Sequence, residues 1–182
     1  MNSVNLGNYY NNGYKPGLKI KIIIWYFVNI IFFKSSVPWP QIIRLTILRF
    51  FGARVGGHVL FKPNISIKYP WLLEIGNNVW IGENVWIDNL AKVTIESNVC
   101  ISQGAMLLCG NHDYKKSNFD LIIGEIVLQV GVWVGAKSVV CPGVTLKSHA
   151  ILAVGSVATK DLAPYSIYQG NPAVKVRERK ME

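Results

Sequence analysis

Large apolar side chains return at almost every sixth position through most of the chain. The spacing matches neither the 3.6-residue period of a helix nor the two-residue alternation of an ordinary strand. Two-residue insertions after Ile67 and Ile87 shift this six-residue repeat, which we call the beat, and a longer insertion separates Leu107 from Leu128. The fourteen positions are Val55, Phe61, Ile67, Ile75, Ile81, Ile87, Ile95, Ile101, Leu107, Leu128, Val134, Val140, Leu146 and Leu152.

The residue four places after each of these positions is mostly small or β-branched, with Ile65, Trp71 and Asn111 as exceptions. A six-residue beat is typical of a coil built from three short parallel strands, in which the repeated apolar side chain points inward. Glycine and asparagine at the expected corners, as in Gly76-Asn77-Asn78, suit tight turns. We therefore predict an all-β fold, a parallel β-helix of about five coils over residues 53–158. A β-sandwich is the alternative, but its strands would not keep a fixed beat of six.

The chain before the repeat predicts two apolar helices. The first covers the run from Ile22 to Phe33, whose 12 residues fall short of the ~20 that a helix needs to span a bilayer. We interpret it as a buried or interfacial helix.

The second helix is expected to start at Pro40 and to end before Gly52. Its apolar stripe comprises Ile43, Ile47 and Phe50, and we expect Arg44 and Arg49 at a solvated edge. Peripheral contact of residues 18–51 with a membrane surface stays open as a hypothesis.

The composition and net charge of the chain indicate its domain count, its class of partner and its compartment. A chain of 182 residues with 51% apolar content fits one domain with short additions. Its 19 Lys and Arg against 10 Asp and Glu give a net charge of +9, which favours an anionic partner: nucleic acid, an acidic membrane surface or a phosphorylated ligand. Three cysteines without a CxxC pair and a polar first segment without a secretory signal predict a cytoplasmic protein, with the inner face of the membrane as an alternative location.

The break in the repeat, residues 108–127, contains one of the three histidines, His112. Loops that leave a rigid scaffold commonly carry ligand chemistry. His58 and His149 occupy turn positions of their hexapeptides and are expected to be solvated. From the residues alone, His112 is either a loop residue that bonds its neighbours or a functional group.

Several motifs are similar to those of the hexapeptide-repeat acyltransferases: IGNNVWIGENVWID, GNHDY, VGVWVGAKSVVCPGVTL and VGSVATKDLAPYSIYQGNPAVKVRER. The resemblance covers residues 52–179, and the apolar helices followed by LRFFGARVG match the colanic-acid-biosynthesis-type O-acetyltransferases in particular. The maltose, galactoside and nodulation acetyltransferases look like cousins. The resemblance implies a left-handed coil and three parts: residues 1–52 with the helices, the β-helix 53–158, and a short basic tail, 159–182, that binds coenzyme A.

The resemblance also implies roles for residues near the break. It implies that His112 is the general base that takes the proton from an acceptor hydroxyl, a task that suits imidazole because its ordinary pKa of ~6.5 is close to working pH. It matches Asn89 to an asparagine that holds the acceptor. Asp88 and Asp113 are candidates to orient the imidazole or to bind sugar hydroxyls, and Asn111 is a further candidate for the acceptor site.

The donor implied by the resemblance is acetyl-CoA, with no metal required. A basic tail can also be merely solvated, so the assignment of its residues rests on the family pattern. The set of expected cofactor contacts is Trp133, Ala136, Gly155, Thr159, Lys160, Lys175 and Arg177.

The expected function is therefore an acetyl-CoA-dependent O-acetyltransferase acting on a sugar or glycan hydroxyl in surface-polysaccharide synthesis. The alternatives are an N-acetyltransferase of an aminosugar or nucleotide sugar, a zinc carbonic anhydrase on the same fold, and a non-catalytic scaffold or membrane-docking module. Attack by Cys109 is disfavoured, because direct transfer from a thioester needs no covalent intermediate. We expect a homotrimer, since Trp80, Trp86 and Trp133 load the outer faces with apolar surface, and no nucleic-acid partner.

Overall fold

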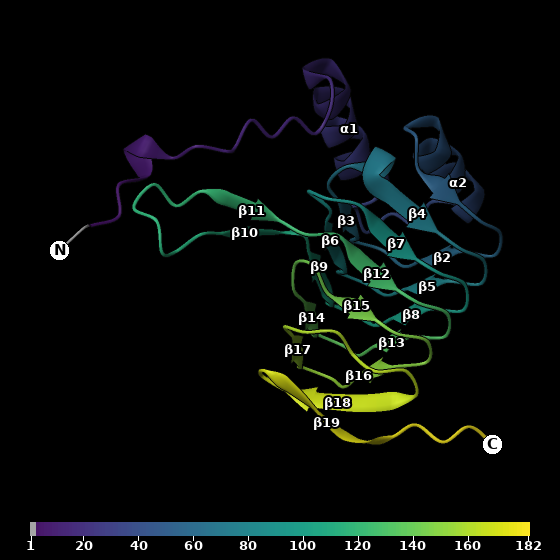
Figure 1. Ribbon diagram of the computed structural model, residues 1–182. Helices are drawn as coiled ribbons and strands as arrows, with labels where there is room; N and C mark the ends of the chain where they lie inside the picture. The colour runs from purple at the N-terminus through teal and green to yellow at the C-terminus, as the bar shows by residue number, and fades with distance from the viewer. Residues whose placement is uncertain (1–2) are drawn as a thin grey trace.

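The computed structural model describes residues 3–182, and its main body is a solenoid of three parallel sheets (Figure 1). The first sheet contains β1 (Arg54–Val55), β4 (Leu73–Ile75), β7 (Val93–Ile95), β12 (Ile126–Leu128) and β15 (Thr145–Leu146). The second contains β2 (Leu60–Phe61), β5 (Trp80–Ile81), β8 (Cys100–Ile101), β13 (Trp133–Val134), β16 (Ile151–Leu152), β18 (Ser166–Gly170) and β19 (Ala173–Glu178). The third contains β3 (Ser66–Ile67), β6 (Trp86–Asp88), β9 (Met106–Leu108), β14 (Val139–Val140) and β17 (Val157–Ala158).

The six-residue beat corresponds to the inward positions of these strands. Thirteen of the fourteen repeated side chains are buried, and only Val55, in the first coil, is half-buried. Each stacks on its counterpart in the next coil: Ile81 is paired in register with Ile101, and Ile101 with Val134. The predicted parallel β-helix is therefore confirmed.

The corners between sheets need backbone that few residues adopt. Asn78, Asn98 and His149 have φ between +57° and +61°, a left-handed conformation that asparagine tolerates better than most residues. At Gly135 a Cβ atom would lie 2.6 Å from the backbone nitrogen of Val154 in the next coil. Glycine there is required by the close stacking of the coils.

The column has one turn more than the predicted number of about five. After β17 the chain continues through Leu162, which bridges Leu146 in parallel, into β18, which pairs with β16. β19 then folds back antiparallel on β18. The segment 159–182, expected to be a short basic tail that binds coenzyme A, thus also builds a sixth turn and a closing hairpin, because Leu162 and Ser166 are buried against the end of the column.

Two helices cover the N-terminal end of the column, α1 (Lys19–Phe32) and α2 (Gln41–Phe50) (Figure 1). The Gln41 side chain donates to and accepts from the backbone of Phe61, at 2.9 and 3.0 Å, and so occupies the free edge of β2. The indole nitrogen of Trp25 donates to the Ile67 carbonyl in β3. The helices therefore satisfy an edge that would otherwise expose unpaired backbone groups.

The prediction that Arg44 lies at a solvated edge is wrong. Its side chain is 1% exposed and donates to the carbonyls of Phe32, Phe61 and Val37 at 2.9, 3.0 and 3.2 Å. The buried face of α2 is formed by Arg44, Leu45 and Leu48, whereas Phe50, expected in the apolar stripe, is 85% exposed. Arginine is buried here because the carbonyls at the chain turns need a donor that carries several N–H groups.

Candidate active site

The break in the repeat is an antiparallel hairpin that projects from the column between β9 and β12 (Figure 1). Its strands are β10 (Gly110–His112) and β11 (Leu121–Ile123), and His112 is in register with Leu121. Asp113 and Asp120 close the hairpin with a backbone hydrogen bond of 2.8 Å, and Lys116 bonds to the Asp120 carboxylate at 3.0 Å. The hairpin therefore gives His112 a defined position outside the regular coil.

The imidazole of His112 is fixed by Phe119, across the hairpin. Its Nδ1 is 3.0 Å from the carbonyl oxygen of Phe119. A carbonyl can only accept, so Nδ1 carries the proton and Nε2 holds the free lone pair. The Phe119 ring stacks on the imidazole with centroids 4.4 Å apart and planes 9° from parallel. This arrangement leaves Nε2 as the nitrogen that can accept a proton.

The N-terminal segment contributes to the same place, and no pattern in the sequence predicts this. The backbone of Asn5 donates to Ser117, and the side chain of Asn12 donates to Leu121. The ring of Tyr9 meets His112 edge-on at 5.7 Å. Residues 5–17, which we call the N-terminal arm, thus run along the hairpin (Figure 1), and Tyr9 of the arm contacts one side of His112.

The arm ends against the corner from which the hairpin leaves. The Tyr14 hydroxyl donates to the Leu90 carbonyl at 2.6 Å. Burial, with Tyr69, Asp88 and Cys109 close by, raises the pKa of Tyr14 above its ordinary value. Tyr14 therefore stays a neutral hydrogen-bond donor that anchors the arm.

Three of the predicted acceptor residues lie around the hairpin. Asn111 is exposed, and its side-chain oxygen accepts from the His112 backbone at 2.8 Å. Asp113 accepts from the Lys115 backbone, and Asp88 pairs with Lys68 at 2.8 Å. Neither carboxylate orients the imidazole as proposed from the sequence, because the Phe119 carbonyl occupies Nδ1.

The prediction that Asn89 holds the acceptor is not supported by its position. The side chain is fully buried, with 0% exposure. Its oxygen accepts from the Tyr69 backbone at 3.0 Å and its nitrogen donates to the Tyr69 carbonyl. Asn89 therefore joins two coils at a corner, where its amide replaces a strand partner, and has no surface to offer a substrate.

Cys109 lies directly before the hairpin but is not a nucleophile in this setting. Its side chain is fully buried, and burial raises the pKa of the thiol to about 11. A thiol with that pKa is protonated at neutral pH. Within residues 3–182, no three His, Cys, Asp or Glu side chains are grouped to hold a metal ion.

The predicted cofactor residues lie on other parts of the column. Ala136 and Gly155 stack at the corner between the second and third sheets, where Gly155 donates to the Ala136 carbonyl at 2.9 Å. Trp133 is on the outer face of the second sheet and its indole donates to Ser102 at 2.9 Å. Thr159 and Lys160 are exposed immediately after β17.

The two remaining cofactor candidates are on β19, beside β18. Lys175 forms an ion pair with Glu178, and Arg177 is exposed. Arg179 donates instead to the carbonyls of Gly131 and His149, which holds the tail on the column. The structure thus places His112, Asn111 and Asp113 on or beside the hairpin and Asp88 at its foot, near Gly110, and it places the cofactor residues on other strands and corners of the column.

The other two histidines sit at corners, as expected, but only one is exposed. His58 is exposed. His149 is half-buried, stacks on Tyr165 with centroids 4.7 Å apart, and its Nδ1 is 2.8 Å from the Ser148 hydroxyl. The expectation that His149 is simply solvated is therefore wrong, because the sixth turn packs against it.

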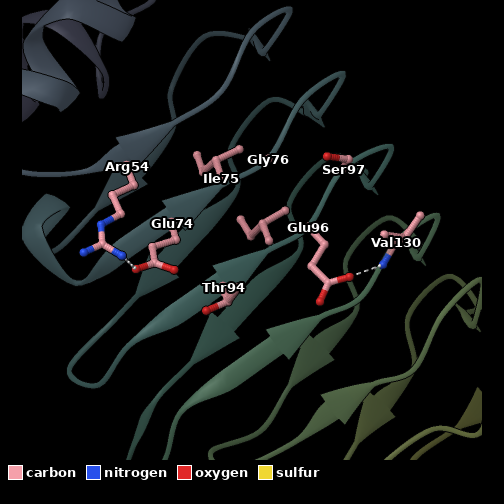
Figure 2. A pocket seen from close by; sticks show the side chains of 9 residues that line it. Arg54, Glu74, Ile75, Gly76, Thr94, Glu96, Ser97 and Val130 are labelled. Atoms are coloured by element: carbon pink, nitrogen blue, oxygen red, sulfur yellow. Dashed lines mark hydrogen bonds and ion pairs between the residues drawn. The ribbon is translucent and has the colours of Figure 1, made fainter.

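A hollow of about 440 Å³ lies on the first sheet, away from the hairpin. Figure 2 shows Glu74 bonded to Arg54 and Glu96 bonded to the backbone of Val130 inside it. Glu74 also pairs with Lys92 at 3.0 Å. None of the predicted site residues is among the described residues that line this hollow, so we do not assign the active site to it.

Known proteins with similar sequences are named as acetyltransferases. The chain is 34% identical over 170 residues to a putative colanic acid biosynthesis acetyltransferase of Escherichia coli K12, covering 92% of each. It is 28% identical to the galactoside O-acetyltransferase of the same organism over 149 residues, 80% of this chain and 73% of that one. No family model matches the chain.

Solved structures share the fold. A hexapeptide-repeat-containing acetyltransferase from Vibrio cholerae superposes with a TM-score of 0.80 at 22% identity, covering 90% of this chain and 93% of that one. A galactoside acetyltransferase in complex with coenzyme A gives a TM-score of 0.79 at 25% identity, with 88% and 82% covered.

Proposed function

The chain belongs to the hexapeptide-repeat acetyltransferase family, and from that premise we propose that it transfers an acetyl group from acetyl-CoA to a sugar hydroxyl in surface-polysaccharide synthesis, with His112 as general base. The observation that carries this proposal is the hydrogen bond from Nδ1 of His112 to the Phe119 carbonyl, which leaves Nε2 as proton acceptor. The names of two relatives support the donor and the acceptor class: one is a galactoside O-acetyltransferase, and a galactoside acetyltransferase was solved in complex with coenzyme A.

The reaction follows from that geometry. Nε2 accepts the proton of the acceptor hydroxyl while the hydroxyl oxygen bonds to the thioester carbonyl carbon. The carbon–sulfur bond then breaks, and the sulfur leaves with the proton that the imidazolium returns. The Phe119 carbonyl stabilises the positive charge that the ring carries between these two proton transfers, because it accepts from Nδ1–H throughout.

The acceptor is proposed to lie between the N-terminal arm and the hairpin. Asn111 is exposed next to the base. Asp88 lies near Gly110, the first residue of the hairpin: a Cβ atom added to Gly110 would be 3.9 Å from one oxygen of the Asp88 carboxylate. Tyr9 forms an aromatic wall on His112. Aromatic surface combined with carboxylate and amide groups suits a sugar, which presents both apolar faces and hydroxyls.

The donor is proposed to run along the corner between the second and third sheets. The stacked amides at Ala136 and Gly155 suit a pantetheine arm. Lys160, just after β17, and Arg177, on β19, are exposed cations at the C-terminal end of the column and suit the phosphates of coenzyme A. The hairpin leaves from the opposite edge of the third sheet, between that sheet and the first. A pantetheine arm on the corner at Ala136 and Gly155 is therefore separated from His112 of the same chain by the width of the third sheet.

A second copy of the chain could bring a donor site next to His112. We propose that the enzyme is a homotrimer in which the hairpin of one chain faces the donor corner of its neighbour. Trp80, Trp86 and Trp133 are 62%, 44% and 45% exposed on the outer faces, an apolar surface suited to such packing. Sedimentation that finds a stable, active monomer would exclude this arrangement.

The experiment that tests the proposed function measures free thiol released from acetyl-CoA with a panel of neutral sugars, aminosugars and nucleotide sugars. Acceptor-dependent thiol release that persists with a chelator supports the proposal, and an alkali-labile ester in the product establishes O-transfer. An amide product would instead make the protein an N-acetyltransferase. Thiol release that never depends on an acceptor would contradict the proposal.

A further inference from the structure

The outer side of α1 is apolar along its whole length. The helix is 14 residues long, and Ile20, Ile23, Ile24, Phe27, Ile30 and Ile31 are each between 41% and 62% exposed, as is Tyr26 beside them. Its inner side carries the helix's only buried polar residue, Asn29, and the indole donor of Trp25. A helix at a water-exposed surface normally has polar residues on its outer side and apolar residues on its inner side. We call this exposed side the outer face of α1.

The segment that contains α1 carries charge of one sign. Residues 1–73 contain nine Lys and Arg and no Asp or Glu, so they account for the whole net charge of +9, and the remaining residues are neutral. Lys19 is exposed at the start of α1, and Lys34 is exposed just after its end. Both ends of the apolar face are thus bounded by cations.

These features together fit the surface of an anionic lipid bilayer. Fourteen residues make a helix of about 21 Å, shorter than the ~30 Å hydrocarbon core. Among residues 3–182 no helix is long and apolar enough to cross a membrane. A face of isoleucine and phenylalanine flanked by lysines suits the boundary between acyl chains and negative headgroups.

A second copy of the chain fits the same face less well. The proposed trimer packs through the outer faces that carry Trp80, Trp86 and Trp133, so a second copy on α1 would be an additional, two-fold contact. That contact would place Lys19 and Lys34 of both copies, and the acid-free segments around them, against one another. Like charges held together at a contact oppose association. An anionic bilayer instead supplies both the apolar surface and the opposite charge.

We propose that α1 is an interfacial membrane anchor: its outer face inserts into an anionic bilayer with the helix axis in the membrane plane. Lys19 and Lys34 then bind headgroups at its two ends. Trp25 and Asn29 keep the helix attached to the column, so the rest of the enzyme stays outside the lipid. This anchor needs neither His112 nor acetyl-CoA.

Docking would also bring the acceptor side of the enzyme near the lipid. A groove of about 250 Å³ is lined by Tyr26 of α1 and by Lys68, Trp86 and Asp88 of the column. On the proposed function, Asp88 belongs to the acceptor site, so this consequence rests on that function. It would favour acceptors that are themselves anchored in the membrane.

The test is co-sedimentation of the full chain with vesicles of phosphatidylcholine alone or with about 30% phosphatidylglycerol. We expect binding to the anionic vesicles and much weaker binding to the neutral ones. Ile23→Asp/Phe27→Asp should weaken binding at least 100-fold, since it removes two inserted side chains and adds two negative charges. Lys19→Gln/Lys34→Gln should weaken binding to anionic vesicles by about 30-fold, at roughly a fivefold loss per lysine.

Met181→Asp is the matched control, because it places the same charge on an exposed apolar side chain near the other end of the column. It should bind like the unaltered chain, with circular dichroism confirming that every variant is folded. If the aspartate pair does not fold, the lysine pair still decides the question. The proposal is overturned if the unaltered chain ignores anionic vesicles or binds neutral ones equally well. It is also overturned if the aspartate or lysine pair binds normally, or if the aspartate pair dissociates an oligomer without changing lipid binding. Because no variant touches the hairpin and the readout is not activity, failure here leaves the proposed function standing.

Discussion

His112 and Phe119 face each other across the hairpin, joined by a 3.0 Å hydrogen bond between Nδ1 and the Phe119 carbonyl and by stacked rings 4.4 Å apart. Phe119 adopts φ of +54°, which is uncommon for a bulky residue. Such a conformation persists only where surrounding contacts enforce it. In this conformation both the carbonyl group and the ring of Phe119 contact the imidazole of His112.

The ring of Phe119 can be tested separately from its carbonyl. Phe119→Ala keeps the carbonyl and removes the stack, so we expect turnover to fall by about tenfold while the affinity for acetyl-CoA stays the same, as the base becomes less well positioned. Phe119→Tyr keeps an aromatic ring and should retain near-normal turnover. Steady-state kinetics check both. Equal turnover in the two variants would show that the stack does not position the base.

The buried arginine predicts a large effect on stability. Arg44→Met leaves the buried carbonyl of Phe61 and the partly buried carbonyls of Phe32 and Val37 without their donor, so we expect a loss of ~3 kcal/mol in the free energy of unfolding. For a chain of this length that corresponds to a fall in Tm of roughly 6–12 °C. Arg49→Met, on the same helix but exposed, should cost ~1 kcal/mol or less. Thermal melting of the pair decides, and equal shifts would mean that burial of Arg44 contributes nothing.

Cys109 predicts a pH effect in alkaline solution. In the unfolded chain its thiol titrates near 9.0, whereas burial raises its pKa in the folded protein to about 11. Between these values the unfolded chain has lost a proton that the folded one keeps, so the free energy of unfolding falls as pH rises from about 9 to 11. Denaturant unfolding at several pH values should show this fall, and it should be shallower in Cys109→Ala. A slope that is unchanged in Cys109→Ala would contradict the assignment.

The same variant bears on the chemistry. Because Cys109 is protonated at neutral pH, Cys109→Ala should keep its turnover, apart from any loss of folded protein. Loss of turnover in a folded Cys109→Ala chain would restore the cysteine as a candidate nucleophile.

The exposed cations after the coil predict a separate kinetic signature. Lys160→Ala and Arg177→Ala should each raise the Michaelis constant for acetyl-CoA by about 5- to 30-fold while sparing turnover at saturation. Phosphate contacts far from the reacting carbon act alike in the ground and transition states. Lys147→Ala, an exposed lysine on another corner, is the control. A turnover defect at saturating acetyl-CoA would place these residues nearer the chemistry than we propose.

The column could be predicted from the sequence because each coil must bury one side chain per sheet. That requirement repeats at every sixth residue, and the inward positions from Phe61 to Leu152 follow it. The same regularity exposed the hairpin, since a loop of twenty residues between Leu107 and Leu128 cannot fit the coil. The coil could be predicted because burial of one side chain per strand is a local requirement that repeats along the chain.

The positions of Asn89, Arg44 and Tyr9 could not be predicted because their partners lie in other elements of the fold. An asparagine at a corner looks the same whether it faces solvent or, like Asn89, bonds to Tyr69 one coil earlier. Arg44 is buried because carbonyls from three other segments meet around it. Tyr9 reaches His112 across more than a hundred residues, and no spacing records such a contact.

The proposed reaction requires His112 as general base, and the substitution His112→Ala tests that role. We predict that turnover falls by roughly 10²–10⁴, with little change in acetyl-CoA affinity, because only the proton acceptor is lost. His58→Ala, which removes an exposed corner histidine, should be near neutral and serves as the control. Steady-state kinetics together with acetyl-CoA binding provide the measurement. Near-normal turnover in a folded His112→Ala enzyme, or a rise in the Michaelis constant alone, would contradict the claim and leave His112 as a binding residue at most.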